Sequence, residues 1–166
     1  MRVLSAAADR RLIVATDGAA RGNPGPAGIG VVVLTPEGEV LAEIARGLGV
    51  ATNNVAEYRA AIAGLRRAAE LGGTDVLLRS DSHLLVEQLS GRYRVKNPRL
   101  QKLHAEARQV ARGFRQVRFE HVPRERNKHA DRLANRGVDE WLAGEGAGST
   151  RPDPPARLWE EDPPPG

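Results

Sequence analysis

Cysteine is absent from this sequence of 166 residues, and aromatic side chains make up only 4% of it. Without a thiol the chain has no disulfide, no thiolate metal site and no cysteine nucleophile, which fits a reducing cytoplasmic location. No apolar run approaches the roughly 20 residues that span a membrane, and the apolar stretch near Met1 is too short for a signal peptide. With so few aromatics, the core must depend on Val, Leu, Ile and Ala.

The residues that are present suit one globular domain with a basic surface. Hydrophobic residues make up 40% of the chain, and its length is that of a single domain with a sizeable core. The formal net charge is +4, and Arg far outnumbers Lys. This excess favours a polyanionic partner only weakly, because a solvated basic surface gives the same composition. Nothing in the sequence requires more than a monomer.

Composition divides the chain into three parts. Residues 9–143 have the pattern of a compact domain, and residues 1–8 are expected to be a flexible N-terminus. Residues 144–166 are rich in Gly, Pro and charge, so we expect a disordered tail in which proline excludes helix. Trp159 in this tail is a candidate contact for an unknown protein partner, although an incidental Trp is the favoured interpretation.

The pattern of apolar residues predicts an α/β fold that begins with a β-meander. Strands are expected at 12–16, 28–34, 39–46, 75–79 and 116–121. Helices are expected at 54–71 and 82–89, through 100–110, and after a capping Asn127. In the first helix, Tyr58, Ile62, Leu65 and Ala69 share one face. Short connections between the first three strands predict antiparallel pairing.

Four acidic residues stand at the ends of predicted strands or near the starts of predicted helices. Asp17 and Asp81 end the first and fourth strands, while Glu57 and Asp131 lie in the first turns of two helices. If the first and fourth strands are parallel neighbours, their carboxyl ends share one edge of the sheet. Carboxylates gathered there would repel one another, and divalent cations such as Mg²⁺, which prefer oxygen ligands, would neutralise them.

Each acid taken alone has a plain structural explanation. Glu57 and Asp131 would each be favourable near a helix N-terminus by roughly 0.3–1 kcal/mol. Asp17 could form a turn before Gly18, and Asp81 could cap the helix that follows it. The occurrence of all four together is harder to explain in this way.

The motifs that carry these acids resemble type 1 ribonuclease H. The matching motifs are Asp17-Gly18, Gly22-Asn23-Pro24-Gly25, Thr52-Asn53-Asn54 with Glu57, Asp81-Ser82, and Asn127 with Asp131. They occur in order over about residues 11–142. The resemblance implies a ribonuclease H-like fold, with a five-stranded mixed sheet of order 3-2-1-4-5 flanked by helices. It also implies hydrolysis of the RNA strand of RNA–DNA hybrids.

The same resemblance implies a site for two Mg²⁺ or Mn²⁺ ions, with Asp17, Glu57, Asp81 and Asp131 as metal-binding and catalytic residues. Products would carry a 5′-phosphate and a 3′-hydroxyl, and cleavage would be largely independent of sequence. We expect Asp17 to bridge both ions and Asp81 to hold the ion that activates water. Glu57 would lie near the leaving group and a 2′-hydroxyl, and Asp131 would be the most mobile ligand.

Residues around the matched motifs are candidates for hybrid binding. Backbone and amide groups in the first two motifs, and polar groups at a helix N-terminus, can contact phosphates and sugars. The candidates are Gly18, Ala19, Asn23, Thr52, Asn53, Asn54, Ser82, His83, Arg92, Lys96, Asn97 and Arg124.

Two features of the family are missing from this sequence. The Gly-His loop before the last helix is absent, and Arg124 or the possible auxiliary Glu125 could partly replace its His. His121 and His129 are weaker candidates. The basic protrusion between the second and third helices is also absent, so we expect Arg92, Lys96 and Asn97 to grip the hybrid.

Two other functions stay open at this point. A related DNA-cutting nuclease of the resolvase kind shares the fold and similar acids, although Asn53, Asn54 and the context of Glu57 favour a hybrid. A non-catalytic hybrid-binding module is the second alternative. It would gain little from four mutually repulsive carboxylates.

Overall fold

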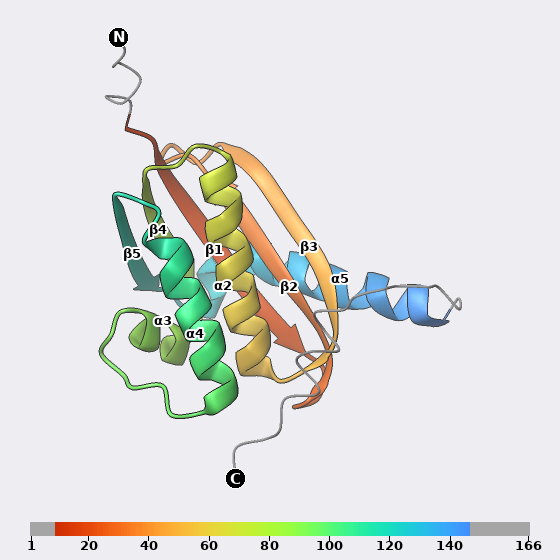
Figure 1. The fold of residues 1–166 in the computed structure, drawn as a ribbon. Coiled ribbons are helices and arrows are strands. Elements are labelled where there is room, and N and C mark those ends of the chain that lie inside the picture. Colours follow the sequence, from red (N-terminus) through yellow and green to blue (C-terminus); the bar gives the residue numbers. More distant parts are fainter. Residues whose placement is uncertain (1–8, 147–166) are drawn as a thin grey trace.

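The structure is a computed structural model that describes residues 9–146, in which strands come first and then alternate with helices (Figure 1). The strands are β1 (Arg11–Ala20), β2 (Gly25–Leu34), β3 (Val40–Ala51), β4 (Asp75–Ser80) and β5 (Gln116–His121). The helices are α2 (Asn53–Glu70), α3 (His83–Leu89), α4 (Pro98–Ala111), the 3-10 turn η1 (Arg124–Arg126) and α5 (Lys128–Gly146). The predictions for residues 1–8 and 147–166 lie outside the described residues.

The sheet has the predicted order, β3-β2-β1-β4-β5. β1 pairs antiparallel with β2, and β2 pairs antiparallel with β3, as the short connections predict. β4 pairs parallel with both β1 and β5. The mixed sheet is therefore confirmed, and β1 lies at its centre between an antiparallel and a parallel neighbour.

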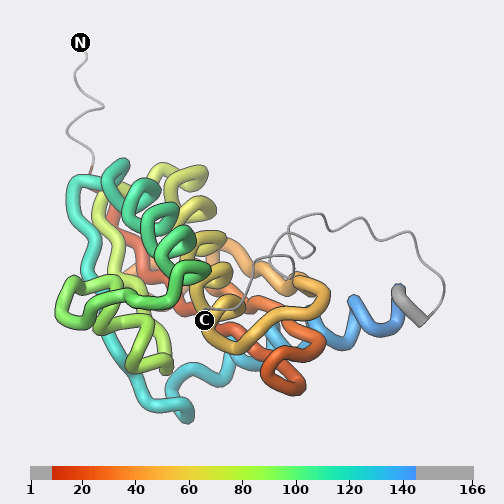
Figure 2. The backbone as a smooth tube through the Cα atoms, turned by 60° about the horizontal axis from the view of Figure 1, so that its bottom comes forward, coloured from red at the N-terminus to blue at the C-terminus, as the bar shows by residue number. Residues whose placement is uncertain are grey.

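Helices cover both faces of the sheet. Figures 1 and 2 show α2 and α4 packed side by side on one face and α5 on the other. The core between α2 and the sheet is aliphatic, as the low aromatic content predicts, and includes Val14, Val31 and Leu78 with no measurable exposure. Within residues 9–146, no helix combines the length and the apolar character needed to cross a bilayer.

Several predicted boundaries are corrected by the structure. β1 does not end before Asp17 but continues to Ala20, because its small residues keep pairing with β2. α2 begins at Asn53, which places Glu57 in its second turn and not its first. α5 reaches Gly146, beyond the domain boundary expected at residue 143.

The predicted apolar face of α2 is right except at its last position. Tyr58, Ile62 and Leu65 are buried, whereas Ala69 is exposed. Ala68 lies in the core in its place. The helix packs flat against the sheet, so its buried face is wider than the single stripe predicted from spacing.

Close packing of α5 on the sheet depends on glycine at Gly30 of β2. A Cβ atom at this position would lie 2.0 Å from the carbonyl oxygen of Ala130 and 2.5 Å from the nitrogen of Ala134. Gly30 is also the β2 partner of Asp17. The approach of α5 that brings Asp131 toward Asp17 therefore requires a residue without a side chain on β2.

We expect Gly30→Ala to lower the free energy of unfolding by at least about 1–3 kcal/mol, because the clash is with rigid helix backbone. Chemical denaturation of both proteins measures the difference. Gly113→Ala is the control, since a Cβ there meets only the oxygen of Val110 at 3.3 Å. Equal losses of stability in the two variants would contradict this account of the packing.

Candidate active site

Asp17 and Asp81 leave the sheet at the same point. The last parallel pair between β1 and β4 is Thr16 with Ser80, and each acid is the next residue along its chain. Beyond this pair β1 continues beside β2 alone, while the chain after β4 turns into α3. The predicted meeting of the carboxyl ends of these strands is therefore confirmed, and it brings the two acids together.

Glu57 reaches the same place from α2. Thr52 caps this helix by accepting a hydrogen bond from the Val55 N–H, and Glu57 is 4% exposed. The Gly18 N–H donates to Oε1 of Glu57 at 3.1 Å. A Cβ atom on Gly18 would lie 2.4 Å from the backbone of Ala56, so only glycine lets α2 approach β1 closely enough for this bond.

Asp17, Glu57 and Asp81 form a cluster, with one carboxylate oxygen from each lying within 4.8 Å of the others. Asp17 and Glu57 are buried and Asp81 is partly exposed, so the cluster opens to solvent on one side. A compact set of carboxylate oxygens suits a hard divalent cation such as Mg²⁺ or Mn²⁺. The residues present therefore fit the cation that the resemblance implies.

Burial and the charges of neighbouring acids raise the pKa of the two buried members of this cluster, Asp17 and Glu57. Burial, followed by the charge of Asp81 and by a hydrogen bond and the charge of Asp131, raises the pKa of Asp17 from 3.8 to about 8. Burial and then the charges of Asp17 and Asp81 raise the pKa of Glu57 well above its usual value. The Gly18 N–H and the positive charge of Arg124 oppose the rise at Glu57.

Asp131 lies beside Asp17 but outside the three-acid cluster. It is in the first turn of α5, as predicted, and its influence on the pKa of Asp17 shows that the two carboxyls are neighbours. The Asn135 side-chain amide, one helical turn later, donates to the backbone oxygen of Asp131 at 3.0 Å and to its Oδ1 at 3.3 Å.

Arg21 fixes the orientation of that amide. Its Nη2 donates to Oδ1 of Asn135 at 3.2 Å, which leaves the Asn135 NH₂ group facing Asp131. Its Nη1 forms an ion pair with Asp139 at 2.8 Å. The β1–β2 connection is thereby tied to α5, and the fourth acid is held through Asn135.

Asn127 does not act as the predicted helix cap. Its side-chain Nδ2 donates instead to the backbone oxygen of Thr16 at 2.9 Å and to Oδ2 of Asp81 at 3.4 Å. The residue is buried, and its Oδ1 has no partner among the described residues. Asn127 therefore links the start of α5 to β1 and helps to hold Asp81. The capping alternative for Asp81 is also wrong, because Ser82 caps α3.

Several candidate substrate contacts gather near the start of α2. A groove of ≈ 210 Å³ is lined by Asn23, Thr52, Asn54, Val55, Asn97, Arg99 and Leu100. Asn23 Oδ1 accepts from the Asn53 N–H at 3.0 Å, which ties the 22–25 loop to the helix. Asn97 caps α4, and its side-chain oxygen Oδ1 accepts hydrogen bonds from the Arg99 and Leu100 N–H groups.

The candidates His83, Arg92 and Lys96 come from α3 and the loop that follows it. His83 is exposed at the start of α3, and its ring meets those of Tyr93 and His121 edge-on. Arg92 is held by Glu87 through bonds of 2.8 and 2.6 Å, which leaves its guanidinium less free to grip a hybrid than expected. Lys96 is exposed.

The candidates around the start of α5 separate into two groups. Arg124 in η1 is near enough to lower the pKa of both Asp17 and Glu57, whereas Glu125 is simply exposed. His129 points to β3, where its Nε2 pairs with Glu43 at 2.5 Å. Arg124 is therefore the better-placed substitute for the missing loop His.

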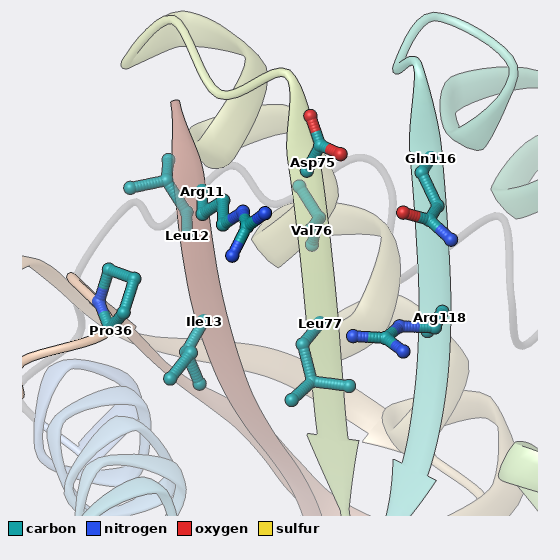
Figure 3. A pocket seen from close by; sticks show the side chains of 9 residues that line it. All are labelled: Arg11, Leu12, Ile13, Pro36, Asp75, Val76, Leu77, Gln116 and Arg118. Carbon is teal, nitrogen blue, oxygen red and sulfur yellow. The ribbon is translucent and has the colours of Figure 1, made fainter. Parts of the chain in front are cut away.

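A pocket of ≈ 280 Å³ lies at the opposite end of the strands from the acids (Figure 3). It is formed where β1, β4 and β5 begin, and its lining includes Arg11, Ile13, Asp75, Leu77, Gln116 and Arg118. Asp75 there is already paired with Arg115. The pocket contains no group of acids and is separate from the candidate active site.

Sequence reasoning missed Asn135 and Arg21 and gave Asn127 the wrong role. The spacing of four residues between Asp131 and Asn135 places them on one helix face, and this signal could have identified the pair. Arg21 and Asn127 act on residues 114 and 111 positions away, so no local pattern reveals their contacts.

Comparison with known proteins gives a consistent family. A family model described as "Reverse transcriptase-like" matches residues 15–137. The "Bifunctional protein Rv2228c" of Mycobacterium tuberculosis is 52% identical over 130 residues, which cover 78% of this chain and 36% of that protein. The "Ribonuclease H" of Alcanivorax borkumensis is 32% identical over 155 residues, covering 84% of this chain and 99% of its own.

A solved structure agrees with this assignment. LC11-RNase H1, determined in complex with an RNA/DNA hybrid, has a TM-score of 0.76 and 42% identity, covering 79% of this chain and 99% of that one. The mycobacterial relatives are much longer, and this chain spans only about a third (36%) of their length.

We expect the stability of the metal-free protein to fall as pH rises from about 4 to 8. The pKa of Asp17 is about 8 when folded and 3.8 in its usual state, so the folded protein binds the extra proton across this range. The contribution of the Asp17 proton to the free energy of unfolding is complete below pH 3.8, and it is lost as pH rises through about 8. Asp17→Asn cannot lose a proton there and should unfold with a flatter pH profile.

Urea unfolding in a chelator, at several pH values, measures this effect. Glu140→Gln, which changes an exposed acid of α5, is the control and should keep the wild-type profile. Parallel profiles for wild type and Asp17→Asn would show that the burial of Asp17 is not coupled to a proton.

Proposed function

The chain belongs to the reverse-transcriptase-like family, as a type 1 ribonuclease H, and we propose on this premise that it hydrolyses the RNA strand of RNA–DNA hybrids. The observation that carries the proposal is the meeting of Asp17, Glu57 and Asp81 at the carboxyl ends of β1 and β4. A similar protein, LC11-RNase H1, has been solved with an RNA/DNA hybrid. The products would carry 5′-phosphate and 3′-hydroxyl ends.

The metal site that we propose takes two Mg²⁺ or Mn²⁺ ions. Asp17 would contribute to both ions, because it comes from the central strand and faces all the other acids. Asp81 and Asp131 would complete one side of the site and Glu57 the other. Two such ions supply stabilisation of the charge that builds on the attacking and leaving oxygens of an in-line displacement.

The protein's own groups keep these ligands in place. The Gly18 N–H holds Glu57, Asn127 holds Asp81, and Asn135 holds Asp131. Hydrogen bonds of this kind orient metal ligands and keep their carboxylates from turning away. Arg124, whose charge reaches Asp17 and Glu57, would hold the scissile phosphate, since a guanidinium can bind phosphate with two parallel hydrogen bonds.

The groove at the start of α2 would bind a phosphate of the hybrid away from the cut. Amide and hydroxyl groups of Asn23, Thr52 and Asn54 line it, and the helix N-terminus beside it favours negative charge. His83, at the start of α3, and Lys96, in the loop after this helix, would contact the second strand. None of these groups forms a base-reading pattern, so cleavage would not depend on sequence. The monomeric state and cytoplasmic location remain predictions from the sequence.

We expect wild-type protein with Mg²⁺ or Mn²⁺ to cut a labelled RNA–DNA hybrid and to leave duplex DNA and four-way junctions intact. Asp17→Asn and Asp81→Asn should each lose about 10³-fold in rate, since metal stabilisation of the transition state is worth several kcal/mol. Glu140→Gln is the matched control. Cutting of junctions in place of hybrids would support a resolvase-like nuclease, and unchanged hybrid binding with no cleavage would support a binding module.

We expect Asn135→Ala to weaken Mn²⁺ binding by about 10–100-fold, because Asp131 loses the amide that orients it. Calorimetric titration of Mn²⁺ into the protein measures the affinity directly. The control is Arg136→Ala, which removes the neighbouring exposed side chain and leaves the amide in place. An unchanged affinity in Asn135→Ala would mean that Asp131 needs no such support.

A further inference from the structure

A basic groove of ≈ 580 Å³ lies between the C-terminal ends of α3 and α4 and the outer edge of β5. We call it the α4–β5 groove. Five arginines line it, namely Arg92, Arg108, Arg112, Arg115 and Arg118, and no acidic residue is among its lining residues. In Figure 1 these elements lie at the edge of the molecule opposite β3.

Three of these five arginines carry a positive charge that no acid in residues 9–144 neutralises. Arg115 is paired with Asp9 and Asp75, and Arg92 with Glu87. Arg108, Arg112 and Arg118 are exposed and form no ion pair with any acid in residues 9–144. Cations are favourable at the C-terminus of α4, which explains part of the presence of Arg108 and Arg112. The side chain of Arg118 points into the separate pocket of Figure 3, so Arg118 borders the groove without facing its floor.

The floor of the groove is apolar and partly open. Val117 and Phe119 of β5 are half-buried, and Ala111 and Phe114 lie beside them. β5 is the last strand of the sheet, so one edge of its backbone has no strand partner. A basic rim over an aromatic and apolar floor is the arrangement by which proteins bind single strands, whose unpaired bases can stack while their phosphates meet arginine.

The groove follows β5 toward the acid cluster. β5 ends at His121, whose ring centroid lies 5.5 Å from that of His83, two residues after Asp81. The next residue, Val122, donates its N–H to the Ser80 oxygen at 2.9 Å. A strand leaving the active site past His83 would therefore reach the groove along β5.

We propose that the α4–β5 groove binds a single-stranded overhang, of RNA or DNA, that continues from a hybrid held in the active site. The proposal rests on the proposed function, because it takes the hybrid as the substrate from which the overhang extends. Phosphates of the overhang contact Arg108 and Arg112, and its unpaired bases lie against Phe119. A duplex cannot use this floor, because its bases are already stacked and paired.

The test compares a blunt hybrid with hybrids that carry an overhang of about 10 nucleotides, a length within the range of single-strand sites. Binding to the full chain is measured in a chelator, so that nothing is cut, over a series of salt concentrations. Overhangs of RNA and of DNA, on either strand, form separate arms. We expect one overhang polarity to bind about tenfold more tightly than the blunt hybrid, with a salt slope steeper by about 1.4 for two phosphate contacts.

The variant Arg108→Gln/Arg112→Gln should lose this advantage and keep the wild-type rate on the blunt hybrid, which also shows that it is folded. Arg46→Gln is the control, because Arg46 is exposed on β3 at the opposite edge of the sheet. Equal binding of blunt and overhang hybrids by wild-type protein would overturn the proposal. So would a double variant whose binding to both hybrids is weakened equally.

Failure of the proposed function gives a different result. In that case the blunt hybrid is not cut when Mg²⁺ or Mn²⁺ is added, whatever the overhang does. If the protein cuts the blunt hybrid but binds overhang and blunt hybrids equally, the proposed function holds and only the role of the α4–β5 groove is wrong.

Discussion

Repulsion among three carboxylates held within 4.8 Å of one another is the constraint that shapes this end of the molecule. Two of the three are buried, and burying unpaired charge is costly. Without a cation the protein meets this cost by keeping protons on Asp17 and Glu57, as their raised pKa values show. A bound cation would take the place of those protons. The cluster is thus better explained as a metal site than as a contribution to folding.

The rigidity of the site decreases outward from the sheet. Asp17 is fixed by the central strand, and Asp81 follows the last pair of a parallel ladder. Glu57 is held by the Gly18 N–H across the closest approach of α2 to β1. Asp131 depends on a longer chain of contacts through Asn135 and Arg21. As the fourth ligand that we propose, Asp131 would adjust during turnover while the other three acids keep the reacting groups aligned.

Most of the sheet was predictable from the sequence because its central strands are apolar runs, and Asp17 and Asp81 each follow such a run. The strand order came from the resemblance, and the parallel pairing of β1 with β4 then placed Asp17 beside Asp81. The continuation of β1 through Ala20 was not predictable, since Gly18, Ala19 and Ala20 carry no alternating pattern and are held by pairing with β2.

The supporting contacts were harder to predict than the acids themselves. Asn127 stands directly before α5, where a helix cap is expected, but its Oδ1 accepts no hydrogen bond and its Nδ2 donates to the backbone oxygen of Thr16. Arg92 looked free to bind substrate, yet Glu87 on the preceding helix engages it with two hydrogen bonds. Both outcomes depend on which groups tertiary folding brings together, and a local pattern carries no information about that.

The most direct test of the central claim is a crystal structure of the protein with Mn²⁺, recorded at the manganese absorption edge. The account predicts anomalous density between the carboxylates of Asp17, Glu57 and Asp81, with those oxygens moved to coordinate it. Manganese density elsewhere in the crystal and none between these three side chains would contradict it.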